Sequence, residues 1–213
     1  MPNPLPPNYP ITEEETLELV KLAQYRIYLP NKNVVKQFLF PGDGYSDAVF
    51  PTIRASGGKR QGDAVFDIQE NQIGVVDLNH SAQEAIFRSH DMSRNGRSRF
   101  TVTHVYGRSQ DIDSYTNLAN LCLTEKAWAA HTDEDGEVQK YLQYHAKVEY
   151  GWEPEQGLAP HDPPYGYQEI TDSWQYLPNN EYAFGDIYSF IMTSPSRVYS
   201  QFRTIDSYRF SNL

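Results

Sequence analysis

Short apolar runs separated by glycine-containing turns fill residues 34–86 and restrict this part of the chain to a small sheet. The runs read VVKQFLF, DAVFPTI, DAVFDI and QIGVVDL, and the intervening PGDG, ASGG and RQGD are typical of turns. Such short runs, bounded by turn residues, are characteristic of strands. The pattern predicts a small antiparallel sheet within an α+β fold that also contains helices.

A helix is predicted immediately before this region. Thr12 is followed by three glutamates, and Glu15 completes a capping box. Apolar residues then recur on one face, which extends the predicted helix to about Tyr28. The residues of this face are Leu17, Leu19, Val20, Leu22 and Ala23.

Further boundaries follow from composition. Residues 1–11 are rich in proline, which predicts an extended arm, and residues 12–213 are expected to form one α+β domain. Residues 81–89 are expected to form a short helix. The segment YAFGDIYSFIM at 182–192 is expected to be a strand or a buried segment.

Composition excludes several classes of protein. The 213-residue chain carries 28 acidic and 18 basic side chains, a formal net charge of −10, which argues against wholesale binding of polyanions. A single cysteine, Cys122, excludes an intramolecular disulfide and a zinc site made of CxxC pairs. Residues 1–10 lack the basic and apolar regions of a secretory signal, and no run of about 18 apolar residues occurs. We therefore expect a cytoplasmic protein without a membrane partner.

Positive charge is concentrated between Arg88 and Arg108. This stretch holds five arginines and one acidic residue, whereas residues 111–172 hold thirteen acidic residues and three lysines. Two explanations stay open: the arginines pair with the acidic remainder of the molecule, or they contact the phosphates of a nucleic acid. The arginines considered for phosphate contact are Arg94, Arg97, Arg99 and Arg108.

The segment from Arg99 to His131 carries the pattern that points most directly to chemistry. FTVTHV alternates as a strand that ends at His104, and after a loop of about a dozen residues TNLANLCLTEKAWAAH continues from Asn117 as a helix-like run. The segments HVYGRSQ and TNLANLC resemble the HNH, or ββα-metal, endonuclease motif. In that family a strand delivers a histidine, a loop ends in Asn-Leu and a helix supplies the last ligand. The resemblance covers about a sixth of the chain.

This resemblance implies a metal-dependent DNA endonuclease, a class used in restriction, by mobile elements and by phages. His104 is implied as the general base, since an imidazole with an ordinary pKa of about 6.5 can take a proton from water at neutral pH. Asn117 is implied to orient that base. His131 and Asp133 are the candidate ligands of a divalent cation, Mg²⁺ or Mn²⁺, which would take up charge from the phosphate.

Two positions differ from the family pattern. Thr103 stands where an acidic ligand often precedes the histidine, and Lys126 stands where the final ligand is expected. In an alternative explanation, His104 hydrogen-bonds to the backbone, Asn117 caps a helix and the apolar positions belong to the core. The protein would then be a non-catalytic acidic interaction or assembly protein on a degenerate nuclease scaffold. A hydrolase of another class that uses His104 is a further alternative, and a homodimer stays open in each case.

Overall fold

The computed structural model describes residues 11–39, 46–78, 80–93, 97–132, 136–154 and 157–205. Almost all of the expected arm at 1–11 therefore lies outside the described residues. The α-helices are α1 (Glu13–Ala23), α2 (Lys32–Lys36), α3 (His80–Ser89), α4 (Gln139–His145), α5 (Tyr167–Ile170), α6 (Ala183–Thr193) and α7 (Arg197–Gln201). The strands are β1 (Ile27–Leu29), β2 (Thr52–Arg54), β3 (Ala64–Phe66), β4 (Gln72–Asp77), β5 (Phe100–His104), β6 (Leu121–Glu125) and β7 (Gln175–Tyr176).

Short helices of other types connect these elements. Among the described residues, five of these are 3-10 helices: η1 (Arg97–Arg99), η2 (Leu118–Asn120), η3 (Lys126–His131), η5 (Thr171–Ser173) and η6 (Phe202–Thr204). The remaining one, η4 (Ala146–Tyr150), is a π-helix that continues directly from α4. Within the described residues, no helix combines the length and the apolar character needed to cross a bilayer.

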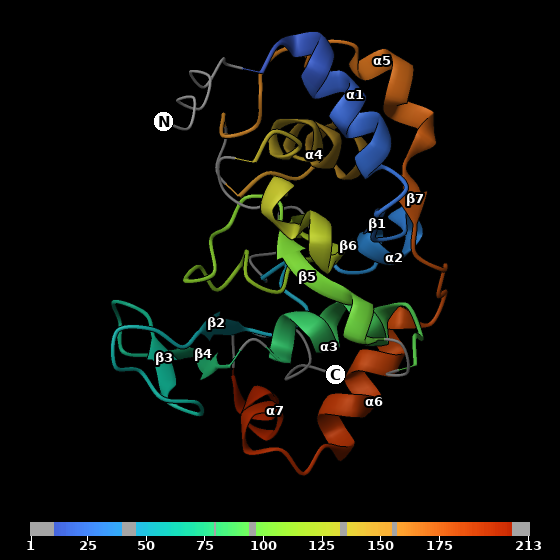
Figure 1. Ribbon diagram of the computed structural model, residues 1–213. Coiled ribbons are helices and arrows are strands. Elements are labelled where there is room, and N and C mark those ends of the chain that lie inside the picture. The colour runs from blue at the N-terminus through green and yellow to red at the C-terminus, as the bar shows by residue number, and fades with distance from the viewer. Residues whose placement is uncertain are drawn as a thin grey trace, which may run out of the picture.

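The strands form two small sheets (Figure 1). The first has the order β5-β6-β1-β7, with β6 antiparallel to both neighbours and β7 parallel to β1. The second has the order β2-β4-β3, with β2 parallel and β3 antiparallel to β4. The α+β class is confirmed, although each sheet is mixed rather than antiparallel as expected.

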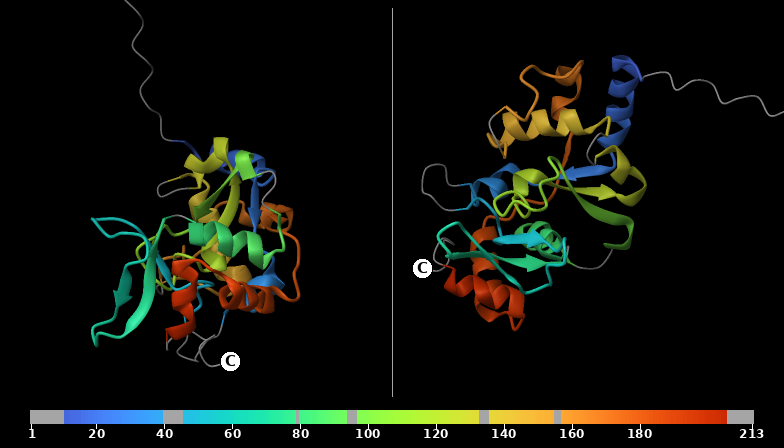
Figure 2. Two further views of the ribbon diagram at one scale, coloured as in Figure 1. Left: turned by 90° about the horizontal axis from the view of Figure 1, so that it is seen from below. Right: turned by 90° about the vertical axis from the view of Figure 1, so that its left-hand side faces the viewer.

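Helices cover the four-stranded sheet at two ends of the molecule. Figures 1 and 2 show α1, α4 and α5 on one side of this sheet and α3, α6 and α7 on the other. The C-terminal helices are anchored by an aromatic cluster around the fully buried Phe50, whose ring centroid lies 5.1 Å from Tyr199 and 5.9 Å from Phe202. Burial of large aromatic rings makes this cluster a major source of stability.

The N-terminal capping box is confirmed, but the helix that it starts is shorter than expected. The Thr12 hydroxyl accepts a hydrogen bond from the Glu15 N–H at 3.2 Å, and the Glu15 carboxylate accepts one from the Thr12 N–H at 2.9 Å. The helix ends at Ala23 instead of near Tyr28. The reason is tertiary, because Ile27–Leu29 forms a central strand between β6 and β7.

Two other segments adopt a different structure from the one predicted, and one is confirmed. Val34 and Val35 lie in α2, which begins after the cap residue Asn31, so the strand expected there is wrong. Residues 182–192 also form no strand: most of them belong to α6, whose buried residues Ala183, Ile187 and Ile191 recur every fourth position. The short helix expected at 81–89 is present as α3.

The loop at 105–117, which follows β5, packs closely on the three-stranded sheet. A close contact lies at Gly74 of β4, where a Cβ atom would overlap the Ile112 side chain and lie 2.6 Å from the Pro51 carbonyl oxygen. A backbone hydrogen bond from Arg54 N–H to the Ser109 carbonyl, 2.8 Å, fixes the loop beside β2. The second sheet therefore serves as a support for this loop.

Replacing Gly74 with alanine is expected to lower the free energy of unfolding by about 2 kcal/mol, because a backbone oxygen cannot move aside cheaply. The matched control is Gly185→Ala in α6, where a Cβ atom meets nothing within 4 Å. This control is expected to raise the free energy of unfolding by up to about 1 kcal/mol through helix propensity. Urea unfolding measures both, and a Gly74→Ala protein as stable as the wild type would contradict the prediction.

Candidate functional site

The segment at 99–131 folds as the antiparallel hairpin β5–β6 followed by η3 (Figure 1). The register pairs Phe100 with Glu125 and His104 with Leu121, and η3 lies against both strands. The strand expected to end at His104 is confirmed. The helix-like run expected from Asn117 is wrong in part, because it comprises η2, the strand β6 and the 3-10 helix η3.

His104 is held firmly at the end of β5. Its half-buried ring stacks on the fully buried Tyr115, with ring centroids 5.3 Å apart and an interplanar angle of 14°. Its Nε2 lies 3.0 Å from the Tyr115 carbonyl oxygen. A carbonyl oxygen can only accept, so Nε2 carries the proton and the neutral ring has its basic lone pair on Nδ1. Tyr115 thus fixes both the plane and the tautomer of the imidazole.

Asn117 acts as a cap rather than as a contact of the histidine. The residue is fully buried, and its Oδ1 accepts a hydrogen bond from the Ala119 N–H at 2.8 Å at the start of η2. Among the described residues this is the only hydrogen bond of the Asn117 side chain, and its buried Nδ2 has no acceptor. The capping role is the one that the alternative explanation expects.

Asn120 braces the loop that follows His104. Its Oδ1 accepts from the Tyr106 N–H at 2.8 Å, and its Nδ2 donates to the Ser114 carbonyl at 2.9 Å. These bonds tie both ends of the loop that follows His104 to the start of β6. Sequence reasoning missed this residue, although a second asparagine in NLANLC, flanked by apolar residues, was the available signal.

The two positions that differ from the family pattern have different surroundings. Thr103 is buried, and its Oγ1 lies 3.0 Å from Cys122 Sγ and 2.9 Å from Thr124 Oγ1. Its hydroxyl is therefore part of the sheet interior. Lys126 is exposed at the start of η3. The ammonium group of Lys126 cannot bind a divalent cation, and the Thr103 hydroxyl is committed to hydrogen bonds inside the sheet.

The predicted metal ligands are only partly described. The Nδ1 of His131, at the end of η3, lies 3.0 Å from Glu137 Oε2, and this hydrogen bond holds the pKa of Glu137 below its usual range. Asp133 lies outside the described residues. Across the described ranges, no group of three or more His, Cys, Asp or Glu side chains is placed to hold a metal ion. We therefore assign no chemical step to a bound cation.

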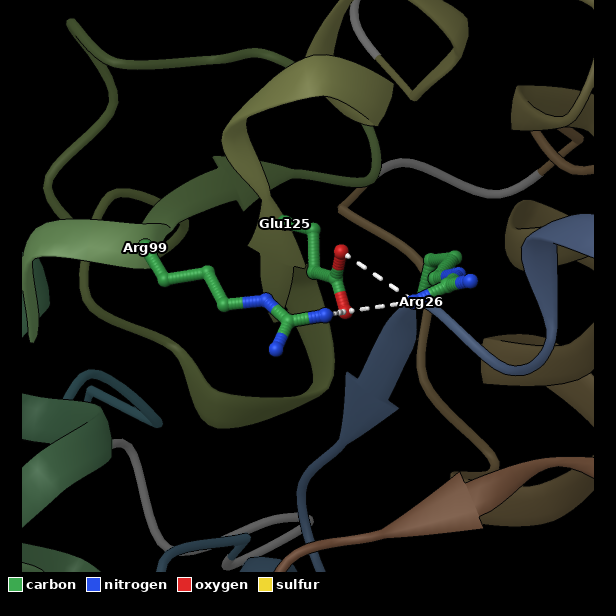
Figure 3. Close-up of polar contacts among 3 residues, drawn as sticks. All are labelled: Arg26, Arg99 and Glu125. Carbon is green, nitrogen blue, oxygen red and sulfur yellow. Dashed lines mark hydrogen bonds and ion pairs between the residues drawn. The ribbon is translucent and has the colours of Figure 1, made fainter. Parts of the chain in front are cut away.

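Arginines of the basic stretch pair with acidic residues of the same molecule. Arg99 Nη2 lies 2.7 Å from Glu125 Oε1, and Arg26 Nη1 lies 3.2 Å from the same oxygen (Figure 3). Burial opposes ionisation of Glu125, but the hydrogen bonds from Arg99 and Arg26 outweigh it and lower its pKa. Arg88 Nε lies 2.6 Å from Glu84 Oε2. The intramolecular explanation therefore holds for Arg88 and Arg99.

Arg99 and Arg108 present exposed surface that a phosphate could reach. Arg108 is exposed, and its backbone is left-handed with φ 53°, directly after the left-handed Gly107. Arg99 keeps 62% of its side chain exposed despite its ion pair. Arg94 lies outside the described residues, as does the side chain of Arg97.

Comparison with known proteins supplies no family for this chain. No family model, no curated protein and no solved structure matches it. The candidate site is therefore defined by its own geometry: an imidazole of fixed tautomer at a strand end, a loop braced by a buried amide, and the exposed residues Arg99 and Arg108 on either side of His104 in the sequence.

Proposed function

We propose that this protein is a DNA endonuclease of the HNH type. The observation that carries the proposal is the placement of His104 at the end of β5, with its Nε2–H bonded to the Tyr115 carbonyl. In phosphodiester hydrolysis, Nδ1 would take the proton of the attacking water. The Tyr115 carbonyl would stabilise the imidazolium that forms, because both its hydrogen bond and its dipole favour the charged ring.

DNA would be held by exposed cations on and beside the same hairpin. Arg108 follows His104 by four residues, and Arg99 begins the strand that His104 ends. Guanidinium groups bind phosphate oxygens in a bidentate manner. Since the chain as a whole carries a net charge of −10, binding is expected to be confined to low ionic strength.

The deciding experiment is incubation of the purified protein with supercoiled plasmid at low salt, with Mg²⁺, with Mn²⁺ or with a chelator. The proposal expects nicking or linearisation that depends on the added cation, for which His131 and Asp133 stay the predicted ligands. A folded protein that cleaves nothing with either metal would refute the nuclease.

Glu125→Gln is expected to strengthen binding to DNA. Glutamine cannot neutralise Arg99 and Arg26, so both guanidinium groups would be available to phosphates. Each added phosphate contact steepens the dependence of log K on log salt by about one. Fluorescence anisotropy of a labelled duplex over a salt series measures this slope.

The matched control is Glu169→Gln, because Glu169 is also a glutamate in an ion pair, 3.1 Å from Lys21. It lies in α5, on the other side of the four-stranded sheet from α3 and α6 (Figure 1). The control removes the same charge and is expected to leave the slope unchanged. An equal increase of the salt slope in both variants would show that the effect comes from overall charge rather than from the arginines beside Glu125.

A second candidate is the non-catalytic interaction or assembly protein. It is favoured by the interior position of the Thr103 hydroxyl and by the pairing of Arg99 with Glu125. Such a protein would keep the hairpin as a structural unit. A folded protein that neither cleaves plasmid nor binds the duplex at low salt would support this candidate over the nuclease.

A further inference from the structure

A cleft of about 420 Å³ lies between the end of α3 and the start of α6. Its walls include Arg88, Asp91, Met92, Tyr182 and Asp186, none of which belongs to the β5–β6 hairpin or to η3. The two helices pack against each other at the end of the molecule opposite to α1 (Figure 1). The cleft is therefore separate from the residues proposed for cleavage.

The cleft has an excess of negative charge. The charge of Arg88 is balanced by Glu84, 2.6 Å away. Asp186 accepts a hydrogen bond from Asn180 Nδ2 at 2.8 Å through one oxygen only. Among the described residues, Asp91 has no side-chain hydrogen bond, and neither Asp91 nor Asp186 has a cationic partner. Two carboxylates thus face a common space without a counter-charge from this part of the chain.

Asp91 occupies a position that disfavours it on two counts. It follows α3 with a left-handed backbone, φ 49°, and the Met92 N–H closes the turn on the Phe87 carbonyl at 2.8 Å. Glycine or asparagine is preferred at this position of a helix end. A carboxylate there also meets the negative end of the helix dipole. No hydrogen bond or ion pair of the Asp91 side chain among the described residues offsets these costs, and such uncompensated costs are typical of a binding residue.

The walls beside the carboxylates favour a flat organic cation. Tyr182 is 76% exposed, and Met92 lines the same space. A guanidinium group stacks on aromatic rings and forms paired hydrogen bonds with carboxylates. We propose that this cleft binds a guanidinium group, held by Asp91 and Asp186 and stacked on Tyr182. The group would belong to a free guanidino compound or to an arginine side chain of a peptide.

Isothermal titration calorimetry distinguishes these two sources. Agmatine serves as the free compound, N-acetyl-arginine-N-methylamide as the peptide-like one, and the citrulline analogue of the latter as its neutral isostere. We expect at least one guanidinium probe to bind, and we expect the citrulline analogue to bind with an affinity that is lower by about tenfold or more. Preference for agmatine assigns a small-molecule ligand, and preference for the arginine derivative assigns a peptide. Binding of neither, or equal binding of the citrulline analogue, would overturn the proposal.

Variants locate the binding. Asp91→Asn and Asp186→Asn are each expected to lower the affinity for the guanidinium probe by about tenfold, because each variant loses a charge-assisted hydrogen bond. Asp91→Asn should at the same time raise the unfolding midpoint, because asparagine suits the left-handed position and removes the charge at the helix end. Glu14→Gln in α1 removes one charge at the far end of the molecule and should leave the affinity unchanged. Wild-type affinity in both aspartate variants would also overturn the proposal.

Discussion

Replacing His104 with alanine is expected to reduce the rate of plasmid nicking by about 10²- to 10⁴-fold, the range for loss of a general base. The substitution removes the Nδ1 lone pair and leaves the pairing of strand β5 with β6 in place, because the imidazole takes no part in it. Single-turnover cleavage of supercoiled plasmid measures the rate, and circular dichroism checks that the variant is folded.

Two further variants separate the chemistry of His104 from its packing. His104→Gln keeps an amide donor for the Tyr115 carbonyl but has no basic nitrogen, so it should fold and be as inactive as the alanine variant. Tyr115→Phe keeps both the ring and the carbonyl that hold His104, and it should cleave at close to the wild-type rate. Full activity of His104→Gln would exclude His104 as the base and remove the main support for the nuclease.

Features encoded locally could be predicted from the sequence. The Thr12–Glu15 capping box depends only on residues three apart, and it is present in the structure. The end of the same helix could not be predicted, because Tyr28 joins a sheet through partners near residues 123 and 175. In the same way, the sequence of α6 does not predict a helix by itself, because its helical face is defined by Ile187 and Ile191, which are buried only in the folded protein.

In the candidate site, too, local features could be predicted from the sequence and features that depend on distant residues could not. Alternation in FTVTH predicts a strand that ends at His104, and the strand ends there. Two asparagines three residues apart cannot be assigned separate roles without the loop conformation, which makes Asn117 a cap and Asn120 a brace. The pairing of Arg99 with Glu125 also escapes sequence reasoning, since it depends on the cross-strand register of β5 and β6.

Two buried histidines are expected to make the fold sensitive to mild acid. His90 Nδ1 lies 2.7 Å from the Ile86 carbonyl, and Nε2 accepts a hydrogen bond from the Asn31 N–H at 3.0 Å. Protonation of Nε2 would place its N–H against the Asn31 N–H, and this hydrogen bond would be lost. Burial lowers the pKa of His90 to about 4, although the bond to Ile86 acts in the opposite direction. Burial likewise lowers the pKa of His145 to about 4, at a site where its two ring nitrogens each lie 2.8 Å from a tyrosine hydroxyl.

The sign of the effect follows from proton linkage. Each histidine has a folded-state pKa of about 4 and an ordinary value of 6.5, so the unfolded chain binds more protons between these pH values. The stabilisation is complete above pH 6.5 and is lost as the pH falls toward 4, by roughly 3 kcal/mol for each histidine. Carboxylates also titrate in this range, so urea unfolding of the wild type is compared with His90→Gln at each pH. Glutamine can replace both hydrogen bonds without titrating, and the two curves should converge as the pH falls; parallel curves would show that His90 contributes nothing to acid sensitivity.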